Sequence, residues 1–226
     1  MNKDFVVTID GPSGAGKGTL SQLLARELGA TLLDSGALYR LVALSSLDKS
    51  IAVDSVDELA VCARDLDVQF SSSASGVRIL LEGRDVTTAI RDERVSMQAS
   101  AIAALEPVRA ALLQRQRDFA GHGPLVADGR DMGTTVFPRA DFKFYLTASA
   151  EARAQRRYAQ LVAAGETVDM ARLVADIEAR DERDQSRASS PLRPAPDARI
   201  IDSTELNIEE VLQQMLLHVS VPGGAC

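Results

Sequence analysis

A stretch near the amino terminus, "GPSGAGKGT" at 11–19, has the residue types and spacing that bind phosphate. Gly11, Gly16 and Lys17 match the pattern G-x-x-x-x-G-K between an apolar run and a helix-periodic run. Glycines let backbone N–H groups turn onto phosphate oxygens, the helix start adds a positive dipole end, and lysine adds a cation. The stretch predicts nucleoside triphosphate binding by Gly11, Pro12, Ser13, Gly14, Ala15, Gly16, Lys17, Gly18 and Thr19.

The residue after Lys17 departs from the general phosphate loop. It is Gly18, where a Ser or Thr hydroxyl would ligate Mg²⁺, and Thr19 comes next. We therefore expect Mg²⁺ to be held by water and phosphates, with Thr19 as an indirect ligand. "GKGT" at this place is typical of nucleoside monophosphate kinases such as adenylate kinase, which indicates phosphate transfer to a small molecule.

Two further segments could bind anions at the same place. "DSGALYR" supplies Ser35, Tyr39 and Arg40 after one expected strand, and "DGRDMG" supplies Arg130 and Asp131 after another. Ligands of open α/β sheets bind outside the carboxyl ends of the strands. We expect these side chains at that edge, beside the phosphate loop.

Two expected helices are rich in arginine. At 100° per residue along a helix, the charged residues within "RDERDQSR" lie within about 60° of one another, and those within "EARAQRR" again share a face. The charged residues on these faces are Arg180, Asp184 and Arg187 in the first, and Arg153, Arg156 and Arg157 in the second. A solvated helix with ion pairs between neighbouring turns remains the alternative for both.

Composition excludes several classes of function. The 226 residues are 46% hydrophobic and 25% charged, with a net charge of −7, which disfavours binding to long nucleic acid. No apolar run reaches the length of about 18 residues that spans a membrane, and there is no signal-peptide pattern. Cys62 and Cys226 lack metal-site spacing, so we expect reduced thiols in a cytoplasmic protein. Arginines number 21 against 4 lysines, which reflects either genome composition or a need for planar anion binders.

The order of elements predicts an α/β fold with a five-stranded parallel sheet and helices on both faces, a three-layer sandwich. The expected strands are 4–10, 30–36, 124–129, 141–148 and 198–204. The expected helices are 17–28, 37–47, 91–104, 107–120, 149–164, 169–186 and 207–219.

Period-two runs at 66–70 and 76–83, with a polar turn "SSSASG" between them and a short run at 84–88, predict a small antiparallel insert. We expect one domain over 1–226, with its core at 1–62 and 104–226, an insert at about 63–103 and a short lid at about 153–168.

Several motifs together resemble the bacterial cytidylate kinases. They are "IDGPSGAGKGTL", "LLDSGALYR", "ADGRDMGTTVFP" and the Arg/Asp helix ending in "RASSPL". The likeness covers nearly the whole chain in order, and "DGRDMGT" is specific because adenylate kinases carry Asp-Gly-aromatic-Pro-Arg there. The resemblance implies a P-loop kinase that transfers the γ-phosphoryl group of ATP to CMP or dCMP.

The resemblance also implies roles for single residues. Ser100, Arg109 and Asp131 would lie near the cytosine edge, and Arg180 and Asp184 would reach the sugar hydroxyls. Ser100 and Arg109 rest on the resemblance alone, since their segment otherwise indicates only an amphipathic helix and turn.

The remaining implied roles concern the acceptor and the phosphates. The acceptor nucleotide would contact Ser35, Tyr39 and Arg40, with Arg40 on its phosphate. Phosphate would be held by Arg130 and Arg187, and the phosphates of ATP by Arg153, Arg156 and Arg157. The residues expected to act in catalysis are Lys17, Arg130, Arg157 and Arg187.

Other functions remain open on the residues alone. They are a kinase for UMP, AMP, shikimate or dephospho-coenzyme A, a regulatory module that binds ATP without turnover, and a nucleic-acid ATPase, which the net charge disfavours. We expect a monomer acting on small molecules, without nucleic acid or membrane partners.

Overall fold

The computed structural model describes residues 4–73, 76–163, 165–187 and 189–219. The chain forms two compact units, one of Met1–Leu33 with Phe119–Cys226 and the other of Asp34–Asp118. Each unit is described by itself below.

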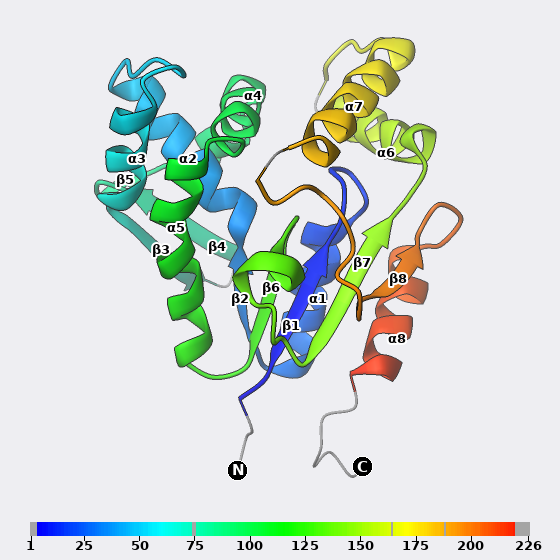
Figure 1. Ribbon diagram of the computed structural model, residues 1–226. Coiled ribbons are helices and arrows are strands. Elements are labelled where there is room, and N and C mark those ends of the chain that lie inside the picture. Colours follow the sequence, from blue (N-terminus) through cyan, green and yellow to red (C-terminus); the bar gives the residue numbers. More distant parts are fainter. Residues whose placement is uncertain (1–3, 74–75, 164, 188, 220–226) are drawn as a thin grey trace. The chain divides into compact units, whose positions relative to one another are not determined.

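The first unit is built on a five-stranded parallel sheet (Figure 1), as the sequence predicts. The strand order is β2-β6-β1-β7-β8. The strands are β1 (Val6–Asp10), β2 (Thr31–Asp34), β6 (Leu125–Gly129), β7 (Phe142–Thr147) and β8 (Arg199–Asp202). β1 pairs with β6 and β7 on its two sides, and β7 pairs with β8. The carboxyl ends of β1, β6 and β7 therefore meet at one edge.

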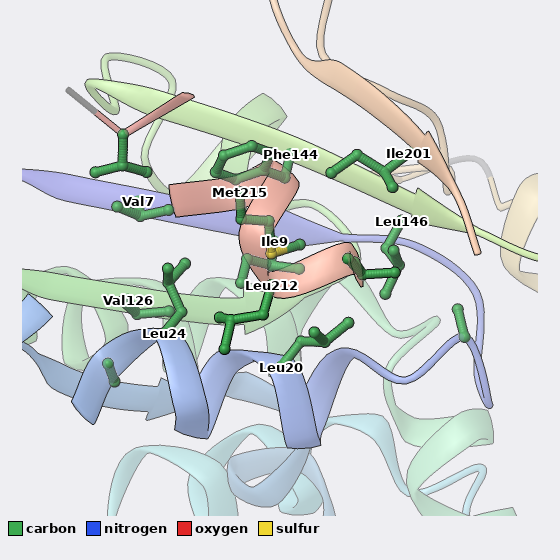
Figure 2. Packing of buried hydrophobic residues seen from close by; sticks show 14 of the residues in the cluster. Val7, Ile9, Leu20, Leu24, Val126, Phe144, Leu146, Ile201, Leu212 and Met215 are labelled. Carbon is green, nitrogen blue, oxygen red and sulfur yellow. The ribbon is translucent and has the colours of Figure 1, made fainter. Parts of the chain in front are cut away.

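One face of this sheet carries the main hydrophobic core (Figure 2). Two helices, α1 (Lys17–Leu28) and α8 (Ile208–His218), supply its outer layer. Leu24 of α1 and Met215 of α8 are fully buried with Ile9 of β1. Because side chains alternate along a strand, Thr8 and Asp10 point to the opposite face. There they meet η3 (Met132–Val136), a short π-helix, so helical segments lie on both faces.

Two longer helices complete the first unit and confirm the expectation for 149–164 and 169–186. They are α6 (Ala150–Ala163) and α7 (Met170–Gln185), which pack on each other. The side chain of Asp169 caps α7 by accepting from the backbone N–H of Ala171 at 2.9 Å. The chain also makes a short 3₁₀ turn, η2 (Phe119–Gly121), before β6.

Within its described residues, the second unit contains four α-helices and a small antiparallel sheet. The helices are α2 (Ser35–Asp48), α3 (Val56–Arg64), α4 (Glu93–Ile102) and α5 (Glu106–Asp118), with a 3₁₀ turn η1 (Ala89–Arg91). The strands are β3 (Val68–Ser73), β4 (Gly76–Leu81) and β5 (Arg84–Asp85). Pro107 lies in the first turn of α5, where the N–H that proline lacks would have no helical partner.

The structure differs from the sequence-based expectations at three places in this unit. β3 runs through Ser71–Ser73, which the sequence assigns to a turn, because these residues pair with Gly76–Arg78 of β4. α2 begins at Ser35 rather than at 37, because Asp34 caps it by accepting from the N–H of Ala37 at 2.8 Å. α3 has no counterpart among the expected elements.

Other expectations concern boundaries and thiols. The second unit is wider than the expected insert at 63–103, and the division into core, insert and lid stays a prediction. Cys62 is a buried free thiol, as expected, whereas Cys226 lies outside the described residues. Among the described helices, none combines the length and apolar character that a bilayer crossing needs.

The buried face of α1 predicts how much stability is lost when one of its side chains is truncated. Leu24 is 0% exposed and Leu217 of α8 is 82% exposed. We expect Leu24→Ala to lower the free energy of unfolding by about 2–5 kcal/mol, since it leaves a cavity in a packed core. The matched Leu217→Ala should change it by less than about 0.5 kcal/mol. Urea unfolding of both variants checks this, and equal losses would contradict the assignment of the core.

Candidate active site

The phosphate loop follows β1 directly and requires glycine where it turns. Gly11 has φ +147°, and a Cβ there would lie 2.0 Å from the carbonyl oxygen of Leu146 in β7. A side chain would therefore force β1 and β7 apart. The loop then delivers Lys17 to the first turn of α1.

Lys17 is buried at the carboxyl edge of the sheet. Its Nζ donates to the carbonyl oxygen of Pro12 at 2.8 Å, so the lysine folds back over its own loop. Burial lowers its pKa to about 8; Asp128 opposes this shift, and the positive charges of Arg130 and Arg180 add to it. Three cations from α1, the end of β6 and α7 thus share one electrostatic environment.

Asp184 of α7 holds two of the predicted arginines. Its side chain is 0% exposed and accepts from Nε of Arg130 at 2.5 Å and from Nη2 of Arg187. Burial by itself would raise the pKa of Asp184, but Arg130 and Arg187 outweigh it and lower the pKa. Asp184 is therefore buried rather than solvated, and it pairs with Arg187 one helical turn away and with Arg130 from outside the helix, whereas Arg180 is half-buried.

Asp10, at the end of β1, is a residue that the sequence analysis missed. Its buried carboxylate accepts from the backbone N–H groups of Met132 and Gly133, both at 2.8 Å. Burial raises its pKa to about 7 even though these hydrogen bonds lower it. Asp10 thereby fixes the start of η3, directly after Arg130 and Asp131. An Asp-Gly pair at the end of an apolar run was the available signal.

Asp128, one residue before the end of β6, lies beside the phosphate loop. Its Oδ2 is 3.8 Å from the point where a Cβ on Gly18 would lie, so a carboxylate occupies the space next to the missing hydroxyl. Carboxylate oxygen is a ligand type that suits Mg²⁺, and these residues fit a water-mediated ion. Thr19 is exposed on α1, and its indirect role stays a prediction. The described residues contain no cluster of three potential metal ligands.

The arginines of α6 lie at different depths. Arg153 is buried, and its Nη1 donates to the carbonyl oxygen of Ser13 in the phosphate loop at 3.1 Å. Arg156 donates to the carbonyl oxygen of Ser203 at 2.5 Å, and the Ser203 hydroxyl donates in turn to Ala15 at 3.3 Å. Arg157 is half-buried. Direct contact of these three arginines with ATP stays a prediction.

In the second unit, Asp34 organises the start of α2. It caps that helix and also pairs with Nη2 of Arg40 at 3.0 Å. The Nε of Arg40 is buried and has no hydrogen-bond partner among the described residues. A buried guanidinium donor left unused is a position from which an anion could be bound.

The other predicted residues of this unit lie on α2, α4 and α5. Ser35 donates from its hydroxyl to Oε1 of Gln116 at 2.7 Å. Cζ of Arg109 stands 5.9 Å from the ring centroid of Tyr39, so that these two side chains form a cation–π pair. Ser100 is half-buried on α4. The structure thus groups Ser35 with Gln116 and Arg109 with Tyr39.

The predicted residues therefore form groups within each unit. In the first unit, Lys17 of the phosphate loop interacts electrostatically with Arg130 and Arg180. Asp184 forms ion pairs with both Arg130 and Arg187. Contacts between this group and the residues on α2, α4 and α5 stay predictions.

A parallel sheet whose first strand leads through such a loop into a helix defines a P-loop nucleotide-binding protein. Phosphoryl transfer needs cations beside such a loop, and Arg130, Arg153 and Arg180 lie there. Residues 7–220 match the family model described as cytidylate kinase. The chain belongs to the cytidylate kinase family.

Known proteins agree with this assignment. The cytidylate kinase of Pseudomonas savastanoi pv. phaseolicola is 56% identical over 222 residues, which cover 97% of each chain. That of Vibrio cholerae is 54% identical over 214 residues, or 95% of each chain. Among solved structures, an uncharacterised protein from Eubacterium ventriosum matches with a TM-score of 0.52 at 10% identity, over 96% of this chain and 98% of the other. That likeness shows the fold alone.

The shared carboxylate of Asp184 predicts a loss of stability when its charge is removed. Asp184→Asn keeps the shape but leaves Arg130 and Arg187 beside a neutral group, so we expect the free energy of unfolding to fall by about 3–5 kcal/mol at pH 7. The exposed pair Arg172–Asp176, 3.9 Å apart on the same helix, offers Asp176→Asn as a control with little effect.

The pH dependence of this difference follows from the sign of the shift. Because the folded-state pKa of Asp184 is lowered, its stabilisation is complete above the ordinary aspartate value of about 3.9 and is lost as pH falls through the folded value. Chemical denaturation of wild type and Asp184→Asn should therefore differ at pH 7 and converge under acid. A gap that widens under acid would refute this role.

Proposed function

We propose that this protein transfers the γ-phosphoryl group of ATP to CMP or dCMP, giving CDP or dCDP and ADP. The observation that carries this proposal is a cluster of cations beside the phosphate loop. Lys17 interacts electrostatically with Arg130 and Arg180, and Asp184 forms ion pairs with both Arg130 and Arg187. Membership of the cytidylate kinase family supports CMP or dCMP as the acceptor. Neither a different small acceptor nor an ATP-binding module without turnover is favoured.

The donor would be held by the loop 11–19. Backbone N–H groups and the start of α1 would bind phosphate oxygens, and Lys17 would leave the carbonyl of Pro12 to meet the β- and γ-phosphates. A bound polyanion favours the protonated lysine, which opposes the lowering of its pKa by burial. Arg157, half-buried on α6, is proposed to add charge on the donor side.

The acceptor nucleotide would be held through its phosphate, its sugar and its base. We assign its phosphate to Arg40, Arg130 and Arg187, since Arg40 keeps a buried Nε donor for an anion. The sugar is assigned to Arg180 and Asp184.

The base edge is assigned to Ser100, Arg109 and Asp131, with Ser35 and Tyr39 beside it. The cation–π pair of Arg109 and Tyr39 would fix the guanidinium in place for recognition of the base.

The reaction requires positioning and charge neutralisation more than proton transfer. The attacking atom is an oxygen of the acceptor phosphate, which is already ionised at neutral pH, so no strong general base is needed. Lys17 and the arginines would neutralise the charge that two polyanions bring together and would hold them in line. When bound, Mg²⁺ supplies further charge neutralisation at the phosphates, and Asp128 with Thr19 would hold it through water.

Several expectations complete this picture and stay predictions. The lid at 153–168 and the insert at 63–103 would close over the substrates and exclude water. The protein would act as a cytoplasmic monomer.

The acceptor is tested with a coupled assay of ADP formation. Purified protein with ATP and Mg²⁺ is offered CMP, dCMP, UMP, AMP or shikimate. We expect kcat/KM to be highest for CMP and dCMP. Equal or higher values for another acceptor would reject the proposed specificity, and ATP binding without transfer to any acceptor would favour the regulatory module.

Removal of a transition-state arginine should affect rate more than stability. We expect Arg187→Ala to lower kcat with CMP by about 10³-fold or more, because it removes charge from the transferring phosphoryl group. Arg183, exposed on the same helix, gives the matched control Arg183→Ala, which should retain wild-type kcat. Near-normal turnover of Arg187→Ala, with folding verified by urea unfolding, would remove Arg187 from the site.

A further inference from the structure

Arg153 lies in the first turn of α6 with its side chain only 4% exposed. Its Nε donates to the carbonyl oxygens of Ala148 at 3.0 Å and Ser149 at 3.3 Å, at the end of β7. Its Nη1 donates to the carbonyl oxygen of Ser13, 140 residues earlier in the chain. One guanidinium therefore ties the start of α6 to the backbone of the phosphate loop.

The same guanidinium makes a bidentate ion pair with Asp181 of α7. Nη1 and Nη2 of Arg153 lie 3.1 Å and 2.5 Å from the two carboxylate oxygens, and Asp181 is 16% exposed. Such fork-to-fork pairs fix geometry as well as charge. Asp181 directly follows Arg180 and precedes Asp184 by one helical turn, so this contact holds the part of α7 that carries the predicted acceptor residues.

The loop is also packed against the stem of Arg153. Gly14 has φ +80°, and a Cβ built there would lie 3.2 Å from Cβ of Arg153. Hydrogen bonding at Ser13 and close packing at Gly14 together fix the middle of the loop, where backbone N–H groups would meet phosphate.

We infer that Arg153 and Asp181 form a strut that positions the phosphate loop against α7 and so sets the spacing between bound donor and acceptor. The inference rests on the proposed function for its acceptor side. In this role Arg153 is a positioning residue that acts through the Ser13 carbonyl and through Asp181. Direct contact of its guanidinium with a phosphate of ATP is the alternative that the experiment below distinguishes.

Two conservative variants separate these roles. Asp181→Asn removes the charge of the strut and leaves Arg153 free to meet phosphate, and Arg153→Lys keeps a charge but loses the fork. If the strut positions the loop, both variants lower kcat/KM for ATP by about 10²-fold, since a misplacement near 1 Å has that effect. The double variant should then be no worse than the poorer single variant within about twofold, because both remove one interaction. Asp176→Asn, in an exposed ion pair of the same helix, is the control.

Other outcomes overturn the strut. A loss with Arg153→Lys and none with Asp181→Asn would show direct phosphate contact by Arg153. Unchanged kcat and KM in both variants, with lower unfolding free energy only, would show a purely structural pair.

A second readout keeps this test independent of the acceptor. The Kd of a fluorescent non-hydrolysable ATP analogue, measured without any acceptor, should rise in both Arg153→Lys and Asp181→Asn. Wild-type protein that binds the analogue but phosphorylates no cytidylate would reject the proposed function, while the Kd values would still decide the strut. Unchanged Kd in both variants would reject the strut.

Discussion

Cations that must meet polyanions repel one another before the ligand is present, and the first unit is arranged around this constraint. Burial is the largest cause that lowers the pKa of Lys17; Asp128 opposes it, and the charges of Arg130 and Arg180 lower the pKa further. Buried carboxylates make the arrangement possible: Asp184 accepts from both Arg130 and Arg187. An unpaired buried charge is strongly destabilising, so each acid here has a structural as well as a chemical role. The stability of the fold and the charge of the site therefore depend on the same contacts.

The parallel sheet gives these charges their common location. In the β1–β6 register Ile9 pairs with Asp128 and Asp10 pairs with Gly129, so two carboxylates end adjacent strands one step apart. Asp10 faces η3 and holds its backbone, whereas Asp128 faces Lys17 and Gly18. Asp10 at the end of β1 thus anchors the segment that follows Arg130, and Asp128 near the end of β6 opposes the positive charge of Lys17 in the phosphate loop. The close approach of β7 at Gly11 completes the edge.

Sequence patterns predicted the parts of the molecule that depend on local periodicity. Buried parallel strands are continuous apolar runs, and the spacing of Arg180, Asp184 and Arg187 placed them on one helix face, where Asp184 indeed contacts Arg187. Elements whose form depends on pairing with distant parts of the chain were harder to predict from the sequence. Ser71–Ser73 belong to β3 because β4 pairs with them, although their composition favours a turn. η3 takes its form from hydrogen bonds to Asp10, more than 120 residues away in sequence.

The arginines of α6 show the same limit within the site. Helical spacing places Arg153, Arg156 and Arg157 together, and the family resemblance assigns all three to the phosphates of ATP. Burial separates one of them: Arg153 is buried against Ser13 and Asp181, whereas Arg156, which donates to Ser203, and Arg157 are both half-buried. Burial depends on where α6 lies against the phosphate loop, which no periodicity within α6 encodes. Arginines that share one helix face in sequence therefore differ in their contacts: Arg153 holds the backbone of the phosphate loop, and Arg156 holds Ser203, which itself contacts the loop.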